Sequence, residues 1–336
     1  MLQTEQVDNG QRFEITNPTK EQIEKTFQRK VLVLEFHVGM WTYKKPSKKM
    51  IELIAEKTGI SEDYLSGQVM AADRKYFKPL ERLVNDFRTF ISENTLINKE
   101  SANFTLPVTL YETMDQKIRE FSREYEKMVF EIASQFEEIK EEAKRFLNGN
   151  FENTLFSEDF YPPPEKLIGE KIIHRQGETS GKRGKYYFDY RYKPYAVSGS
   201  LEADLVDESL SDLKKIMQEE TMQDFNQVIK DVWQRIFTVT SKLKETMKKP
   251  EREDKKGEIQ SPIFRDSVIE NIKDLVNIIP SLNIFQDAAI DQARTELYRE
   301  LCQLDPQALR DNKELRQDAE KKADKILSKL PGILAS

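Results

Sequence analysis

Apolar residues recur at intervals of three and four across residues 111–147, and this spacing restricts the fold more than any other feature of the sequence. Such intervals place apolar side chains on one face of an α-helix, where they form a narrow seam. Roughly 34 residues at about 1.5 Å each predict a rod about 50 Å long. The seam residues are Met114, Ile118, Phe121, Tyr125, Met128, Ile132, Phe136, Ile139, Ala143 and Phe146.

A second long helix is predicted within residues 200–247. Its seam consists of Met222, Phe225, Ile229, Val232, Ile236, Val239 and Leu243, with Leu201, Leu205, Leu213 and Met217 as an upstream extension. Because helices bury such seams by pairing, we expect a mainly α fold built on an elongated antiparallel hairpin of long helices that resembles a coiled coil. The low content of glycine (12 of 336 residues) also favours helices. The pattern leaves open whether the seams pair within one chain or between chains.

The segment between the two long helices, residues 148–199, contains the turn-forming motifs NGN and PPP and is predicted to reverse the chain. Its strand pattern is an alternation of Tyr186, Phe188, Tyr190 and Tyr192 with Tyr187, Asp189, Arg191 and Lys193. Alternation of this kind is typical of a β-strand with one aromatic face. We therefore expect a small β-containing insert at the tip of the hairpin, with Ile172 and Ile173 in a partner strand.

A similar alternation of apolar residues predicts an N-terminal strand that begins at Val31 and ends near the run Lys44, Lys45 and Pro46. Ser47 is placed to cap the helix that follows. Prolines and charge runs divide the rest of the chain. The expected organisation is a flexible tail (1–17), a base of one strand and helices (18–110), the long hairpin (111–147 and 200–247), the β-containing insert (148–199), a charged linker (248–260) and a C-terminal helical base (261–336).

Composition excludes several classes of protein. The formal net charge of −6 argues against a globally basic nucleic-acid binder. A single cysteine, Cys302, cannot form an intramolecular disulfide or a thiolate zinc site. The N-terminal residues lack the apolar core of a secretory signal, and no apolar run is long enough to span a bilayer. We expect a cytoplasmic protein that does not enter the membrane.

No group of residues predicts catalysis. His37 could act with Glu35 on the same strand, and Cys302 could act as a nucleophile, but an ordinary strand histidine and a buried thiol are the better interpretations. The glycine-rich segment 177–185 does not lie between an apolar strand and a helix, so it does not match a phosphate-binding loop. We therefore expect no enzymatic activity, no cofactor and no metal.

Two surfaces are candidates for binding a partner. In the insert, six cations between Arg175 and Lys193 are interleaved with tyrosines, which are the residue types that contact phosphates and stack on bases. Contact with a protein, or packing of the tyrosines on the helices, is the favoured alternative. The other candidate is the end of the N-terminal strand, where burial is favoured. The candidate residues are Trp41, Tyr43, Lys44, Lys45, Lys182, Arg183, Lys185, Tyr186, Tyr187, Tyr190, Arg191, Tyr192 and Lys193.

Two segments of the chain resemble a bacterial and phage family without an assigned function. The first, residues 31–48, is a strand that ends in Trp41 followed by Lys44 and Lys45, and the second, residues 277–330, contains the run Leu-Arg-Asp-Asn at 309–312. Members of this family are encoded on phages and mobile elements, often near MoxR-type AAA+ ATPases and von Willebrand A-domain proteins of the cobalt-chelatase kind. The resemblance implies a non-catalytic partner in an ATPase-centred assembly and carries no catalytic residue.

The sequence therefore predicts a non-enzymatic interaction or scaffold protein, as an adaptor or partner subunit of a MoxR-type AAA+ ATPase and A-domain system. One alternative is a nucleic-acid-binding protein that uses the basic, tyrosine-rich residues 175–195. Another is a structural protein that self-assembles into an oligomer through its apolar seams.

Overall fold

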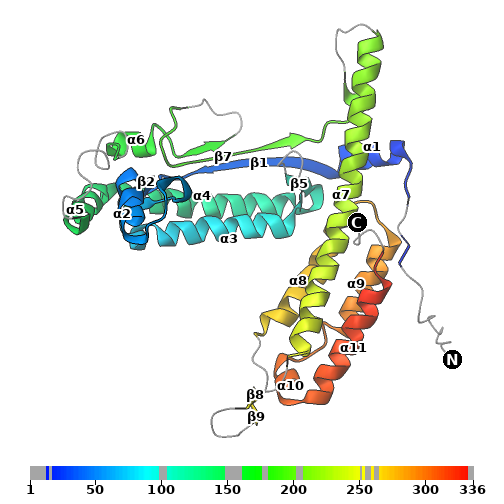
Figure 1. The fold of residues 1–336 in the computed structure, drawn as a ribbon. Coiled ribbons are helices and arrows are strands. Elements are labelled where there is room, and N and C mark those ends of the chain that lie inside the picture. The colour runs from blue at the N-terminus through cyan, green and yellow to red at the C-terminus, as the bar shows by residue number, and fades with distance from the viewer. Residues whose placement is uncertain are drawn as a thin grey trace, which may run out of the picture. The chain divides into compact units, whose positions relative to one another are not determined.

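The computed structural model shows a mainly helical chain with a small mixed sheet (Figure 1), which confirms the predicted fold class at that level. None of the described helices is long and apolar enough to cross a membrane. The residues that the structure describes are 13–14, 17–97, 104–147, 161–175, 181–201, 207–249, 252–253, 259–260 and 265–331.

The chain divides into two compact units, and neither is a single continuous segment. The first unit comprises Met1–Val33, Asn94–Tyr111 and Pro194–Ser336, and the second comprises Leu34–Glu93 and Glu112–Lys193. Strands β1 (Val31–Gly39) and β7 (Tyr187–Pro194) each pass from one unit into the other. They belong to a five-stranded sheet with the order β4-β5-β1-β7-β6.

Helices dominate the first unit, and its core surrounds the C-terminal half of the longest one, α7. In Figure 1, α8, α9 and α11 gather along that half, and α7 contacts α11 and α8. Trp233, Ile236 and Leu243 of α7 are fully buried there. The helices are α1 (Lys20–Lys30), α7 (Asp207–Met247), α8 (Ser267–Leu282), α9 (Ala288–Glu300), α10 (Pro306–Asp311) and α11 (Lys313–Lys329).

Local sequence explains where several of these helices begin. Thr19 and Gln22 form a capping box at the start of α1. The carboxylate of Asp287 accepts hydrogen bonds from the backbone of Ala289 and Ile290, and Asn312 caps α11 in the same way. Each cap satisfies backbone N–H groups that the first turn of a helix leaves without a partner.

The remaining elements of the first unit are short. Phe13, which lies within the predicted flexible tail, is buried and stacks on Trp233 at 5.5 Å between ring centroids. Two short strands lie within the predicted charged linker and form an antiparallel pair. These elements are β4 (Leu96–Ile97), β5 (Phe104–Pro107), β8 (Arg252–Glu253) and β9 (Ile259–Gln260), with 3-10 turns at Val108–Leu110 and Ser198–Ser200.

The second unit is a layer of strands packed on helices. Figure 1 shows α3 and α4 running along β1 and β7. Phe87 of α3 lies 5.4 Å from Phe36 and 4.0 Å from Phe121, and Phe121 lies 4.9 Å from Phe188, so aromatic rings join the sheet to both helices. The elements are β2 (Lys44–Pro46), α2 (Lys48–Thr58), β3 (Gln68–Met70), α3 (Lys78–Asn94), α4 (Tyr111–Ser134), α5 (Phe136–Leu147), α6 (Pro164–Ile168) and β6 (Ile173–Arg175), with 3-10 turns at Glu62–Tyr64 and Arg74–Tyr76.

The predicted hairpin of two long helices is not confirmed. The first predicted rod is two helices, α4 and α5, which separate at Gln135, where the backbone N–H bonds to Ile132 three residues back. Apart from Tyr111, α4 and α5 belong to the second unit, whereas α7 belongs to the first. The seams are therefore buried by other partners: that of α4 by the sheet and α3, and that of α7 by α8 and α11.

The predicted strand in residues 148–199 is confirmed, but it is not part of a separate cap at a hairpin tip. β7 lies between β1 and β6 in the sheet, and β6 pairs with it in parallel, with Ile173 opposite Phe188. Residues 148–160 and 176–180 of the predicted insert lie outside the described residues.

A buried ion pair in the first unit gives a test of its core. The ammonium of Lys329 bonds both carboxylate oxygens of Glu296, at 2.9 and 3.1 Å, and the two side chains are only 8% and 10% exposed. Lys329→Met leaves a buried carboxylate without its partner, so we expect a loss of about 3 kcal/mol in the free energy of unfolding. Adding Glu296→Leu should recover most of that loss.

The chain has two tryptophans, Trp41 and Trp233, and they lie in different units. Urea denaturation followed by the fluorescence of Trp233, in a Trp41→Phe background, therefore reports on the first unit. Glu21→Gln, which removes the exposed pair with Lys25, is the control and should change stability little. An equal loss in the single and double variants would contradict the prediction.

Candidate functional site

Trp41 and Tyr43, which the sequence marks as candidate binding residues, are buried in the second unit. The Trp41 ring lies 5.0 Å from Phe136 and 5.1 Å from Tyr161, and it is 6% exposed. Tyr43 stacks on Phe77 and donates a hydrogen bond of 2.7 Å to Glu81. Burial and this bond raise the pKa of Tyr43. Both side chains are therefore packed inside the second unit, just before β2, rather than displayed on its surface.

The tyrosines of β7 also point mainly into the protein. Tyr186 and Tyr190 are buried, and burial raises the pKa of Tyr186 well above its usual range. Tyr187 is half-buried, with its ring next to Gly39 on β1, where a Cβ would meet it at 2.2 Å. Glycine at position 39 thus permits the two strands to approach. Tyr192 is half-buried as well, so these rings do not form an open platform for stacking bases.

Several cations of the same segment are already paired with carboxylates. Glu35 on β1 contacts Arg191 at 2.8 Å and Lys193 at 2.7 Å. Arg183 contacts Asp189 at 2.5 Å and lies over the ring of Tyr187. The hydrogen bond from Lys193 in particular lowers the pKa of Glu35, which keeps the carboxylate ionised. These contacts pair three of the six cations of the predicted basic surface with two carboxylates.

Four lysines from the candidate set remain near the surface, at two places. Lys182 and Lys185 are exposed in the loop that precedes β7, and within the described part of the chain their ammonium groups contact no carboxylate. Lys44 is exposed and Lys45 half-buried on β2. The structure therefore separates the thirteen candidates into buried or half-buried aromatic residues, three cations paired with carboxylates and four lysines near the surface.

The residues considered for catalysis are not brought together. His37 is exposed on β1, whereas His174 is buried on β6 in register with Asp189. Cys302 is buried in the first unit, and burial raises the pKa of its thiol, which favours the unreactive protonated form. Among the described residues, no group of three or more His, Cys, Asp or Glu side chains could hold a metal ion.

The clearest exposed apolar surface lies on and beside α2. We call it the α2 patch: Leu53, Ile60, Tyr64 and Met70, which are 41%, 48%, 86% and 53% exposed. Helix α2 contributes no buried residue to the protein, and it contacts the 3-10 turn that contains Tyr64. The backbone of Ser47 before α2 bonds Gly67 next to β3. Periodicity in the sequence does not predict this patch, because apolar spacing does not specify which surface covers a helix.

Lysines border the α2 patch on one side. Lys44, Lys48 and Lys49 are exposed before and within the first turn of α2, and Lys45 is half-buried. Lys48 lies 3.8 Å from Glu52, a contact between two largely exposed groups. An apolar surface next to a group of positive charges suits a partner that presents apolar and acidic residues together.

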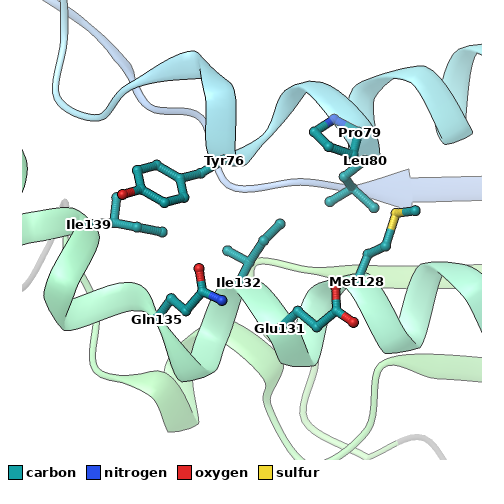
Figure 2. Close-up of a pocket in the computed structure, with 8 residues that line it drawn as sticks. All are labelled: Tyr76, Pro79, Leu80, Met128, Glu131, Ile132, Gln135 and Ile139. Atoms are coloured by element: carbon teal, nitrogen blue, oxygen red, sulfur yellow. The ribbon is translucent and has the colours of Figure 1, made fainter.

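The second unit also contains a small cavity (Figure 2), which has a volume of about 100 Å³. It lies between the start of α3 and the junction of α4 with α5, and five of the eight residues that line it are apolar. Polar atoms enter it from Tyr76, Glu131 and Gln135.

The ion pairs of Glu35 predict how acid affects stability. A carboxylate whose pKa is lower in the folded than in the unfolded protein stabilises the fold above its ordinary value of 4.5, and that contribution is lost as the pH falls through the lower folded-state value. Glu35→Gln should therefore reduce the loss of stability on acidification below about pH 4.5. Urea denaturation measured between neutral pH and pH 3 checks this.

Glu138→Gln is the matched control, since Glu138 is exposed and forms no ion pair within the described residues. If Glu35→Gln and Glu138→Gln had the same pH dependence, the contacts from Arg191 and Lys193 would not contribute to folding.

Comparison of the chain with protein-family models, with curated proteins and with solved structures found no match.

Proposed function

We propose that the protein is a non-enzymatic interaction subunit that binds a protein partner through the α2 patch. The observation that carries this proposal is the exposure of Leu53, Ile60, Tyr64 and Met70 around a helix that buries no side chain. Exposed apolar patches are characteristic of interaction sites, and aromatic residues and methionine are enriched in protein interfaces.

The partner we propose is a MoxR-type AAA+ ATPase, acting in the cytoplasm together with an A-domain protein of a phage or mobile element. The resemblance of residues 31–48 and 277–330 to proteins encoded beside such ATPases supports this choice. Lys44, Lys48 and Lys49 beside the patch favour an acidic surface on the ATPase.

Variants of the α2 patch test the proposal. Leu53→Glu with Tyr64→Glu should weaken binding of the neighbouring ATPase at least tenfold, because the changes place two carboxylates in an apolar interface. Size exclusion with light scattering, in the presence of ATP, measures the complex. Tyr298→Glu, at another exposed tyrosine, on α9, is the control and should bind as the unchanged protein does.

Two results would count against the proposal. An ATPase that forms no complex with the unchanged protein would exclude that partner, and a complex unaffected by the double variant would exclude the patch. The same run reports the mass of the protein alone, and a value well above 39.4 kDa would favour self-assembly. Exposed Leu213 and Ile216, in a stretch of α7 without buried residues, support that alternative.

A nucleic-acid-binding role is the second candidate, supported by the exposed Lys182 and Lys185 before β7. It has less support than the first, because Arg183, Arg191 and Lys193 are paired with carboxylates and Tyr186 and Tyr190 are buried.

If this role is correct, binding of a labelled oligonucleotide should weaken steeply with salt, and Lys182→Glu with Lys185→Glu should abolish it. Fluorescence anisotropy with single- and double-stranded probes measures the affinity. Lys214→Glu with Lys215→Glu on α7 makes the same change in net charge and serves as the control. Binding that is absent, or insensitive to salt, would exclude the role.

A further inference from the structure

The cavity of the second unit has an apolar base. Leu80 of α3 and Ile132 and Ile139 of α4 and α5 are buried, and the partly exposed Met128 completes this wall. Figure 2 shows these side chains around the hollow, with the carboxylate of Glu131 and the amide of Gln135 on the same side of it. The cavity therefore combines an apolar interior with two hydrogen-bond acceptors.

The walls of this cavity are held by contacts that do not depend on a ligand. Helix α4 ends at Ser134, and the cavity lies next to the break between α4 and α5. The backbone N–H of Ile139 in α5 donates a hydrogen bond of 2.9 Å to the backbone oxygen of Gln135, which holds the two helix ends at this break. Tyr76, on the opposite wall, donates its hydroxyl to Glu142, which also contacts Lys75 at 2.6 Å. A cavity that is already formed binds a ligand without the cost of ordering its walls.

The volume limits the size of the group that fits. An apolar cavity of about 150 Å³ holds benzene, so about 100 Å³ suits an aliphatic group of roughly four carbons. The side chain of leucine beyond its Cα has that number.

The carboxylate of Glu131 at the edge of the cavity limits which charge a ligand can carry next to its aliphatic group. Glu131 is exposed, and within the described part of the chain its carboxylate contacts no cation. The tyrosine hydroxyl is already engaged by Glu142. A positive charge beside the aliphatic group would reach Glu131, whereas a negative charge there would be repelled.

We propose that this cavity binds a protein segment in which a leucine side chain lies next to a lysine or arginine. The leucine fills the space above Ile132 and Ile139, and the cation contacts Glu131. This site lies on α3, α4 and α5 and is distinct from the α2 patch, so it does not depend on the proposed function.

Methyl NMR of the full chain tests this with two matched peptides, N-acetyl-leucyl-lysinamide and N-acetyl-leucyl-glutamamide. We expect the lysine peptide to shift the methyl signals of Met128, Ile132 and Ile139, with a Kd on the order of 1 mM. The glutamate peptide should bind roughly two- to fivefold more weakly, which is the range for an exposed charge pair.

Two variants separate the two parts of the proposal. Glu131→Gln should remove the preference for the lysine peptide while both peptides still shift the methyl signals. Met128→Trp should fill the space and abolish both shifts, and the unchanged signals of distant methyl groups show that the variant is folded. No shift at Met128, Ile132 and Ile139 in the unchanged protein, or equal binding of the two peptides, would overturn the proposal.

Discussion

The packing of Phe87 against Phe36 and Phe121 joins strand β1 to helices α3 and α4, and it shows which face of the strand is apolar in the second unit. Neighbouring residues of a strand point to opposite faces of a sheet. Because Phe36 and Phe188 point toward α3 and α4, Glu35 and Asp189 must lie on the other face. The same alternation brings Arg191 and Lys193 of β7 beside Glu35.

That arrangement changes the interpretation of the basic, tyrosine-rich residues 175–195. In the sequence, alternating tyrosines and cations are typical both of a nucleic-acid surface and of an amphipathic strand. In the structure, the tyrosines are largely buried and Arg183, Arg191 and Lys193 have acidic partners. A cation that is already paired with a carboxylate gains less from a phosphate, because binding must compete with the existing contact. The segment therefore contributes more to the sheet than to an open binding surface.

Interaction with another protein is better supported than binding of nucleic acid, because the apolar residues of the α2 patch are exposed. Helix α2 is formed and capped by Ser47, yet it buries no side chain. The cavity beside α4 differs from the α2 patch in kind, since it is small, has the buried Leu80, Ile132 and Ile139 at its base and is bordered by the exposed carboxylate of Glu131. The α2 patch suits a partner surface that presents apolar and acidic residues together, whereas the cavity suits one aliphatic side chain beside a cation.

The sequence by itself determined the helical periods of α4, α5 and α7, the strands β1 and β7, and caps such as Ser47 and Asp305, because these depend on local spacing and local hydrogen bonds. It also indicated that Trp41 is better buried than exposed. Only the tertiary structure decided that α7 packs on α8 and α11, and that Glu35 meets Arg191 and Lys193 from a strand far away in sequence. The physical reason is that a period of three and four specifies which face of a helix is apolar but not which surface covers it.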